Sequence, residues 1–190
     1  MARKSLREDI VTAAIEQFHI LGYNGTSVKT ITDAAGAPKG SFYNHFDSKQ
    51  ELAIIALECY ARTRRVDELL DRSADPLRRL RAHFEFLRDE NLDYDFRRGC
   101  LVGDLAVEAA DNTEEIRVAT KEIFQVWLGA IASTIDDAQQ AGLVSRAVAP
   151  GTLARFILSA WEGTLIAARV ERSPRPYEAF FTMVFDSVLR

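Results

Sequence analysis

Helical periodicity, interrupted at intervals by capping and breaking residues, restricts the fold of this sequence more than any other feature. Near the start, Ser5 and Glu8 have the spacing of a capping box, and apolar residues then recur every three to four positions until Gly22. The serine-to-glutamate spacing returns at Ser48, and a proline suited to a first helical position follows Asp75. No alternation typical of a strand persists anywhere, so the sequence predicts an all-α fold.

Glycine and proline residues divide the chain into about nine predicted helices. Gly36 and Pro38 separate two short helices, Gly142 ends a long one, and prolines at 174 and 176 precede the last. Residues 93–99 are polar and aromatic and indicate a loop. The predicted helices cover approximately residues 6–21, 27–35, 39–46, 49–71, 76–91, 101–110, 113–141, 150–172 and 177–188.

The composition favours a water-soluble, cytoplasmic protein. Hydrophobic residues make up 47% and charged residues 27% of the 190 residues, which is ordinary for a globular chain. The two cysteines are too few for a disulfide framework, and no apolar run approaches the roughly 20 residues of a membrane span. The first residues also lack the apolar core of a signal peptide.

Charge is distributed unevenly along the chain. The formal net charge is −4, which by itself argues against a nucleic-acid partner. Residues 1–65 nevertheless contain nine Lys and Arg against seven Asp and Glu, and four of the five lysines lie in the first fifty residues. This pattern indicates either two parts with different partners or chance variation in a solvated surface.

The two short helices on either side of Gly36 have the pattern of a helix-turn-helix. Gly36 suits a turn residue with positive φ. The apolar residues that we expect to hold the pair together are Val28, Ile31, Ala34, Ala35, Phe42 and Phe46. The outward residues of the second helix are types that suit DNA: Lys39, Ser41 and Tyr43 for phosphates, and Asn44 and His45 for base edges. Gly40 permits a close approach of the backbone to DNA. Positive charge nearby comes from Lys29, Lys49 and a short arm of Arg3 and Lys4.

The run from Lys39 to Leu52, KGSFYNHFDSKQEL, closely resembles the recognition-helix signature of TetR-family transcriptional regulators. The resemblance is strong over about residues 8–55. It implies a three-helix DNA-binding domain in residues 1–50 and a larger helical domain in residues 51–190 that binds effectors and dimerises. By motif position it implies DNA contacts at Lys29, Lys39, Gly40, Ser41, Tyr43, Asn44, His45 and Lys49. The alternative is a helix-turn-helix used only for packing.

A dimeric DNA-binding protein needs a two-fold interface outside its DNA-binding helices. The last two predicted helices have wide apolar stripes that exceed the expected need of one core, and the resemblance implies the same placement. We therefore expect the interface at Leu153, Phe156, Ile157, Ala160, Thr164, Ala168, Phe180, Phe181, Val184 and Phe185. The alternative is that these residues are all intrachain core.

An effector pocket is expected among the middle helices. Its candidate lining residues are Tyr60, Phe84, Leu87, Leu101, Leu105, Phe124, Trp127, Leu128, Ile131, Trp161 and Leu165, each of which could equally be plain core. The charged residues that could orient a polar ligand group are Arg64, Arg65, Arg88 and Glu162.

Cys100 is a second candidate for sensing. It follows two arginines and precedes a predicted helix, and both features favour a reactive thiolate. The segment RRGCLVGDLAVE is similar to a TetR subgroup that contains electrophile- and oxidant-responsive regulators. The alternative is a small buried apolar side chain.

Catalysis is not indicated by any motif. The three histidines lack metal-ligand spacing, and there is no nucleophile elbow, P-loop or dinucleotide-binding glycine run, so we expect no metal and no cofactor. The sequence thus predicts a homodimeric, ligand-responsive repressor that binds double-stranded operator DNA. The alternatives are a redox sensor acting through Cys100 and a helical ligand-binding dimer without specific DNA binding.

Overall fold

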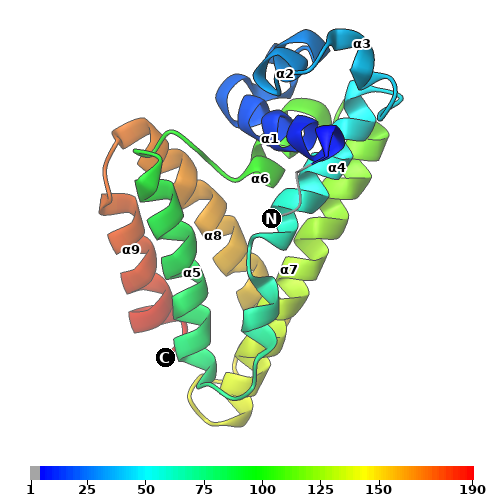
Figure 1. Ribbon diagram of the computed structural model, residues 1–190. Helices are drawn as coiled ribbons and strands as arrows, with labels where there is room; N and C mark the ends of the chain where they lie inside the picture. Colours follow the sequence, from blue (N-terminus) through cyan, green and yellow to red (C-terminus); the bar gives the residue numbers. More distant parts are fainter. Residues whose placement is uncertain (1–4) are drawn as a thin grey trace. The chain divides into compact units, whose positions relative to one another are not determined.

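The computed structural model describes residues 5–190, and every regular element in this range is a helix (Figure 1). None of these helices combines the length and apolar character that a membrane crossing requires. The all-α prediction, with nine α-helices among the described residues, is confirmed, whereas Arg3 and Lys4 of the suggested arm lie outside them. The elements are α1 (Leu6–Gly25), α2 (Val28–Ala34), α3 (Lys39–Phe42), α4 (Lys49–Arg62), the 3-10 helix η1 (Val66–Leu70), α5 (Pro76–Asp93), α6 (Leu101–Ala109), α7 (Glu114–Gln140), α8 (Pro150–Glu171), α9 (Arg175–Met183) and the π-helical turn η2 (Val184–Val188).

The chain forms two compact units, each built from two stretches of sequence. The first unit contains the residues up to Thr63 together with residues 101–123, and the second contains residues 64–100 and 124–190. Helix α6 and the first part of α7 therefore belong with the N-terminal helices α1–α4. The assignment of DNA contact to residues 1–50 and of effector binding and dimerisation to residues 51–190 stays a prediction.

Side chains at the helix starts satisfy backbone N–H groups that have no partner within the helix. The Ser5 N–H donates to the Glu8 carboxylate at 2.9 Å, and the Glu8 N–H donates to the Ser5 hydroxyl at 3.3 Å, which confirms the capping box. Ser27 caps α2, and Asp75 caps α5 directly before a proline. Local sequence signals thus fix where these helices begin.

Two helices end earlier than the sequence predicts. Helix α3 stops at Phe42 rather than near residue 46, and α4 stops at Arg62 rather than near residue 71. After α4 the side chain of Arg64 is buried against the Glu90 carboxylate of α5, and Arg65 adopts a left-handed backbone with φ of 55°. The helix therefore ends without a local glycine or proline signal, next to a residue whose partner is distant in the sequence.

The core of the first unit joins the N-terminal helices to α6. Ile10 and Phe18 of α1, Leu52 of α4 and Leu101 of α6 are all fully or almost fully buried. Of the residues expected to hold α2 and α3 together, Ile31, Phe42 and Phe46 are buried, but Ala34 is exposed. The side chains of Thr32 and Ala37 occupy buried positions in the pair instead.

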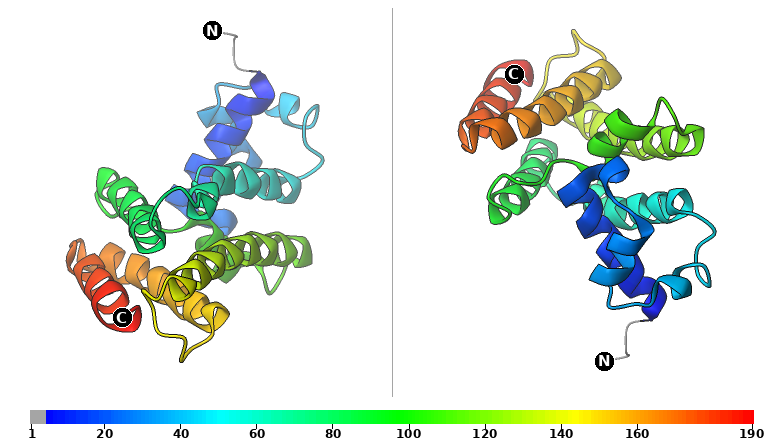
Figure 2. Two further views of the ribbon diagram at one scale, coloured as in Figure 1. Left: turned by 90° about the horizontal axis from the view of Figure 1, so that it is seen from below. Right: turned by 90° about the horizontal axis from the view of Figure 1, so that it is seen from above.

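The second unit has an aromatic core between α5, α7, α8 and α9. The Trp161 ring centroid lies 5.1 Å from those of Phe84 and Phe180 and 5.6 Å from that of Tyr177. Helices α8 and α9 lie side by side in both figures (Figures 1 and 2). Tilted and edge-to-face contacts of this kind stabilise a core beyond the area they bury.

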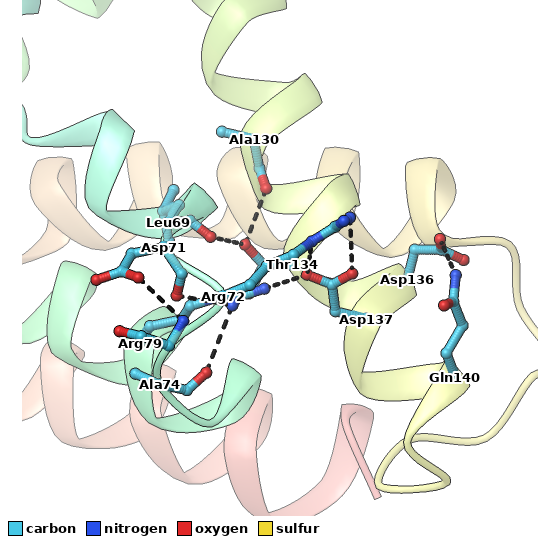
Figure 3. Close-up of polar contacts among 11 residues, drawn as sticks. Leu69, Asp71, Arg72, Ala74, Arg79, Ala130, Thr134, Asp136, Asp137 and Gln140 are labelled. Atoms are coloured by element: carbon cyan, nitrogen blue, oxygen red, sulfur yellow. Dashed lines mark hydrogen bonds and ion pairs between the residues drawn. The ribbon is translucent and has the colours of Figure 1, made fainter.

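A buried polar network ties α5, η1 and α7 together in the second unit (Figure 3). The Arg79 guanidinium pairs with Asp137 of α7 and donates to the backbone carbonyl of Asp71 at 2.9 Å. The Thr134 hydroxyl lies 2.8 Å from the backbone carbonyl oxygen of Leu69, to which it donates. Because the Arg79 side chain is only 6% exposed, its charge depends on Asp137 for compensation.

We predict that Asp137→Ala lowers the free energy of unfolding by about 3 kcal/mol, because it leaves the Arg79 charge buried and unpaired. Chemical denaturation monitored by circular dichroism measures this loss. The matched control is Asp136→Ala, since Asp136 is exposed and contacts Gln140 only one turn further along α7 (Figure 3). Equal, small effects of the two substitutions would contradict the role given to the Arg79–Asp137 pair.

Candidate nucleic-acid interface and ligand-binding core

Two buried aromatic residues anchor the short helix α3 and the turn that follows it. Phe42 and Phe46 are almost fully buried, and their ring centroids lie 5.4 Å apart. Gly36, with φ of 64°, makes the predicted left-handed turn before α3. After α3 the His45 N–H donates to the Phe42 carbonyl at 2.9 Å, which keeps the turn compact. The intervening residues are thereby held on the surface.

The structure presents most of the predicted DNA-contact residues to solvent. Tyr43 is 61% exposed, and nothing surrounds the Cβ position of Gly40 within 4 Å. Ser41 is half-buried, and its hydroxyl donates to the Pro38 carbonyl at 2.6 Å. The residues that form this exposed surface, which we call the α3 face, are Lys39, Gly40, Ser41, Tyr43, Asn44 and His45. Lys29, exposed on α2, forms an ion pair with Asp33.

Lys49 differs from the other candidates because its side chain points into the first unit. Its ammonium donates to the backbone carbonyls of Tyr23 at 2.8 Å and Thr26 at 3.0 Å, and it lies 4.1 Å from the centre of the Tyr23 ring. Burial lowers the pKa of Lys49, and the negative charge of Glu108 partly opposes this shift. The DNA contact predicted for Lys49 stays a prediction, and the structure shows that its ammonium also binds the backbone at the end of α1.

The candidate pocket residues divide between the two units. Tyr60, Leu101 and Leu105 are buried in the first unit, and the others lie in the second. Phe84, Leu87, Trp127, Ile131, Trp161 and Leu165 are buried there, and Phe124 and Leu128 are half-buried. Three of the four charged candidates form ion pairs: Arg64 with Glu90, Arg65 with Glu68 and Arg88 with Asp89. The fourth, Glu162 on α8, is half-buried.

Sequence analysis missed three buried polar side chains in the second unit. The Trp127 indole N–H donates to His83 Nε2 at 2.9 Å, so the neutral imidazole holds its proton on Nδ1. That Nδ1, the Tyr177 hydroxyl and the Asn91 side-chain oxygen are buried and have no hydrogen-bond partner among the described residues. Together with Arg79, the polar residues at positions 83 and 91 interrupt the apolar pattern on the buried side of α5, and this was the signal available in the sequence.

Electrostatics keeps His83 uncharged in the folded protein. Burial lowers the pKa of His83 to about 4, and the positive charges of Arg64 and Arg65 act in the same direction. Burial also raises the pKa of the Tyr177 phenol. Both groups are therefore neutral near pH 7, and each can donate one hydrogen bond to an acceptor.

Cys100 is buried and lies immediately before α6. The two arginines that precede it are engaged elsewhere. The Arg97 guanidinium lies 3.5 Å from the Asp95 carboxylate, and Arg98 stacks 3.4 Å from the centre of the Tyr94 ring. Low exposure favours the interpretation of Cys100 as a small buried side chain over that of a reactive thiol. Cys59, on α4, is half-buried.

The proposed interface residues on α8 and α9 are mostly intrachain core. Leu153, Ile157 and Ala168 are buried against the chain itself, as are Phe180, Phe181 and Val184. Phe185, Ala160 and Thr164 are half-buried, and only Phe156 is largely exposed. The dimer interface itself stays a prediction, because apolar spacing marks a buried helix face without showing whether its own chain or a second copy covers it.

A different face of α8 is both apolar and exposed. Phe156 is 52% exposed, Ile166 65% and Val170 78%, and Gly163 lies between them with open space around it. These four residues recur at intervals of seven, three and four positions and so share one side of the helix. We call them the α8 outer face.

The exposed ammonium, hydroxyl, amide and imidazole groups on a helix-turn-helix define a DNA-binding transcriptional regulator. No group of histidine, cysteine and carboxylate side chains within residues 5–190 is placed to hold a metal ion. Residues 10–54 match the family described as bacterial regulatory proteins, tetR family, and residues 76–184 match the tetracyclin repressor-like, C-terminal domain. The chain belongs to the TetR family.

Comparison with individual proteins supports the same assignment. The transcriptional repressor DhaR of Mycobacterium sp. (strain GP1) is 35% identical over 192 residues, covering 100% of this chain and 95% of DhaR. A crystal structure of a regulatory protein TetR from Rhodobacter sphaeroides has a TM-score of 0.88 and 32% identity, covering 95% of this chain and 97% of that one. The repressor NemR of Escherichia coli (strain K12) is 25% identical over 160 residues, covering 83% of this chain and 80% of NemR. These relatives are regulators rather than enzymes.

We predict that the protein loses stability as the pH falls from about 6.5 towards 4. Within this window His83 is protonated in the unfolded chain but not in the folded one, so protonation favours unfolding. The contribution amounts to about 3 kcal/mol across the whole window.

His83→Gln retains an acceptor for Trp127 and removes the titration, so its unfolding free energy should depend less on pH. Denaturation at a series of pH values tests this, with the exposed His45→Gln as control. Parallel pH profiles for wild type and His83→Gln would contradict it.

Proposed function

We propose that this TetR-family protein is a homodimeric repressor that binds operator DNA through the α3 face and releases it when a small molecule binds the second unit. The observation that supports DNA binding most directly is the α3 face itself. Its polar side chains are exposed on a segment that two buried phenylalanines anchor. A helix-turn-helix used only for packing would have no need of this surface.

The residue types on the α3 face indicate separate contact roles. Lys39 and Tyr43 contact phosphates, which supplies affinity, and Asn44 and His45 contact base edges, which supplies sequence preference. Lys29 adds a phosphate contact from α2 once Asp33 releases it, since both side chains are more than half exposed. A phosphate contact by Lys49 stays a prediction, since two backbone carbonyls accept hydrogen bonds from its ammonium and one N–H donor remains.

Dimerisation through the α8 outer face supports the binding of two half-sites. An exposed apolar row with a glycine in it allows close approach of a second helix, and two copies related by a two-fold axis bury the same row. Two recognition segments then contact half-sites about one helical turn apart, roughly 34–36 Å, or a near multiple of it.

The aromatic core of the second unit is the proposed effector site. Buried polar groups without partners are costly, so a ligand that satisfies them gains affinity from them. His83 Nδ1–H and the Tyr177 hydroxyl are neutral donors, and their surroundings are aromatic. We therefore propose an effector with an apolar body and a hydrogen-bond acceptor such as a carbonyl or carboxylate oxygen. Sensing through Cys100 is the less favoured alternative because the thiol is buried.

We predict nanomolar binding to a short palindrome in the DNA upstream of the gene for this protein, with affinity that falls steeply as salt rises. Tyr43→Ala should weaken binding at least about tenfold, and Lys39→Ala should reduce the salt slope by about one. Lys121→Ala, an exposed lysine of the first unit on α7, is the matched control and should leave both unchanged. Fluorescence anisotropy across a salt series measures these quantities. Weak binding that is equal on random DNA and in every variant would contradict the proposal.

We predict that Ile166→Glu converts the dimer to monomers, because a carboxylate in the α8 outer face cannot be buried against a second copy. Sedimentation equilibrium measures the change in mass. Ile20→Glu is the matched control, since Ile20 of α1 is 63% exposed against 65% for Ile166. A wild-type chain that sediments as a monomer, or an Ile166→Glu variant that remains dimeric, would show that the α8 outer face is not the interface.

A further inference from the structure

Helix α1 is kinked at Gly22, and its last residues lead directly into the helix-turn-helix. We call residues 22–26 the α1–α2 turn. Thr26 is almost fully buried in this turn, and its hydroxyl lies 2.6 Å from the Gly22 carbonyl oxygen. Ser27, the next residue, caps α2. The path of the turn therefore sets where α2 begins. Helix α2 contacts α3, and Ile31 of α2 and Phe42 of α3 are both fully buried.

A carboxylate from a distant part of the sequence occupies the inside of this turn. Gly22 has φ of 72° and ψ of 174°, a conformation that is essentially restricted to glycine. A Cβ atom at Gly22 would lie 2.0 Å from the Glu108 Oε1 atom. The Asn24 N–H donates to Glu108 Oε2 at 3.0 Å, and the Asn24 side-chain amide donates to the Glu108 backbone carbonyl at 3.4 Å. Glu108, on α6, thus satisfies the backbone where α1 breaks.

Lys49 holds the same turn from α4. Its ammonium donates hydrogen bonds to the carbonyls of Tyr23 and Thr26, while the Glu108 carboxylate accepts a hydrogen bond from the Asn24 N–H. The charges of Lys49 and Glu108 attract each other, since Glu108 raises the pKa that burial lowers. Neither Lys49 nor Glu108 belongs to the α3 face. Together they form hydrogen bonds with the backbone of residues 23, 24 and 26, in the turn that precedes α2.

We propose that Glu108 is a positioning residue for DNA binding, which acts by fixing the α1–α2 turn through Asn24 and Gly22. The proposal rests on the DNA-binding function proposed above. When the Glu108 carboxylate is removed, the Asn24 N–H loses its acceptor and the turn gains alternative conformations. The operator then binds only the fraction of molecules whose turn has the native path.

The sign of the effect distinguishes positioning from simple electrostatics. Removing a negative charge from a DNA-binding protein ordinarily leaves its affinity for DNA unchanged or raises it. We expect Glu108→Ala instead to weaken operator binding by about tenfold, the range of a lost hydrogen bond to a charged acceptor. Glu122→Ala is the matched control, since Glu122 is an exposed glutamate of the same unit on α7 and should show no loss. Glu108→Gln keeps a carbonyl acceptor for Asn24 and should restore most of the affinity.

Operator titrations of the wild type and the three variants, at a temperature where circular dichroism shows all of them folded, test the proposal. Amide exchange at Asn24, measured on the same proteins without DNA, gives a second readout. We expect it to speed up in Glu108→Ala and to stay near wild type in Glu108→Gln and Glu122→Ala.

Wild-type affinity in Glu108→Ala, or equal losses in Glu108→Ala and Glu122→Ala, would overturn the positioning role. If the wild type itself binds no operator, the proposed DNA-binding function is wrong. The rate of amide exchange at Asn24 then still shows whether Glu108 fixes the turn. Unchanged Asn24 exchange in Glu108→Ala would overturn that part as well.

Discussion

The glycine conformation at Gly22 is the constraint on which the first unit depends. It ends the regular part of α1 and turns the chain back towards α2, and the space that a side chain would fill holds the Glu108 carboxylate. Side chains of α6 and α4 satisfy polar backbone groups next to this break. A short helix such as α3 has little stability of its own, so its placement relies on this frame and on Phe42 and Phe46.

The second unit depends on a different balance between apolar packing and buried polarity. An ion pair at each end of α5, Arg79 with Asp137 and Arg64 with Glu90, places charge next to an aromatic core. Nearby, His83 stays neutral because burial and two arginine charges oppose its protonation. A core that retains polar groups without partners is less stable than it could be, and such a cost is common where a protein binds a ligand.

Features that arise from neighbouring residues could be predicted from the sequence. The caps at Ser5, Ser48 and Asp75, the turn at Gly36 and the exposed α3 face follow from residue types a few positions apart. Features that depend on distant partners could not. No local signal shows that Glu108 reaches the turn at Gly22.

The same limit explains why the end of α4, the surroundings of Lys49 and the covering of α8 could not be predicted. Arg64 pairs with distant Glu90 just after α4 ends, and backbone carbonyls accept hydrogen bonds from the Lys49 ammonium. On α8, apolar spacing identified the buried side of the helix, whereas Phe156, Ile166 and Val170 lie exposed on another side. Apolar periodicity reports burial but not the identity of the covering chain.

The central claim is that α6, although distant in sequence, folds as part of the unit that presents the α3 face. Native-state hydrogen exchange at increasing denaturant measures the opening free energy of each segment and tests this claim most directly. The account predicts that amides of α6 open together with those of α1 and α4. Opening of α6 together with α5 and α8, while α1 and α4 remain closed, would contradict it.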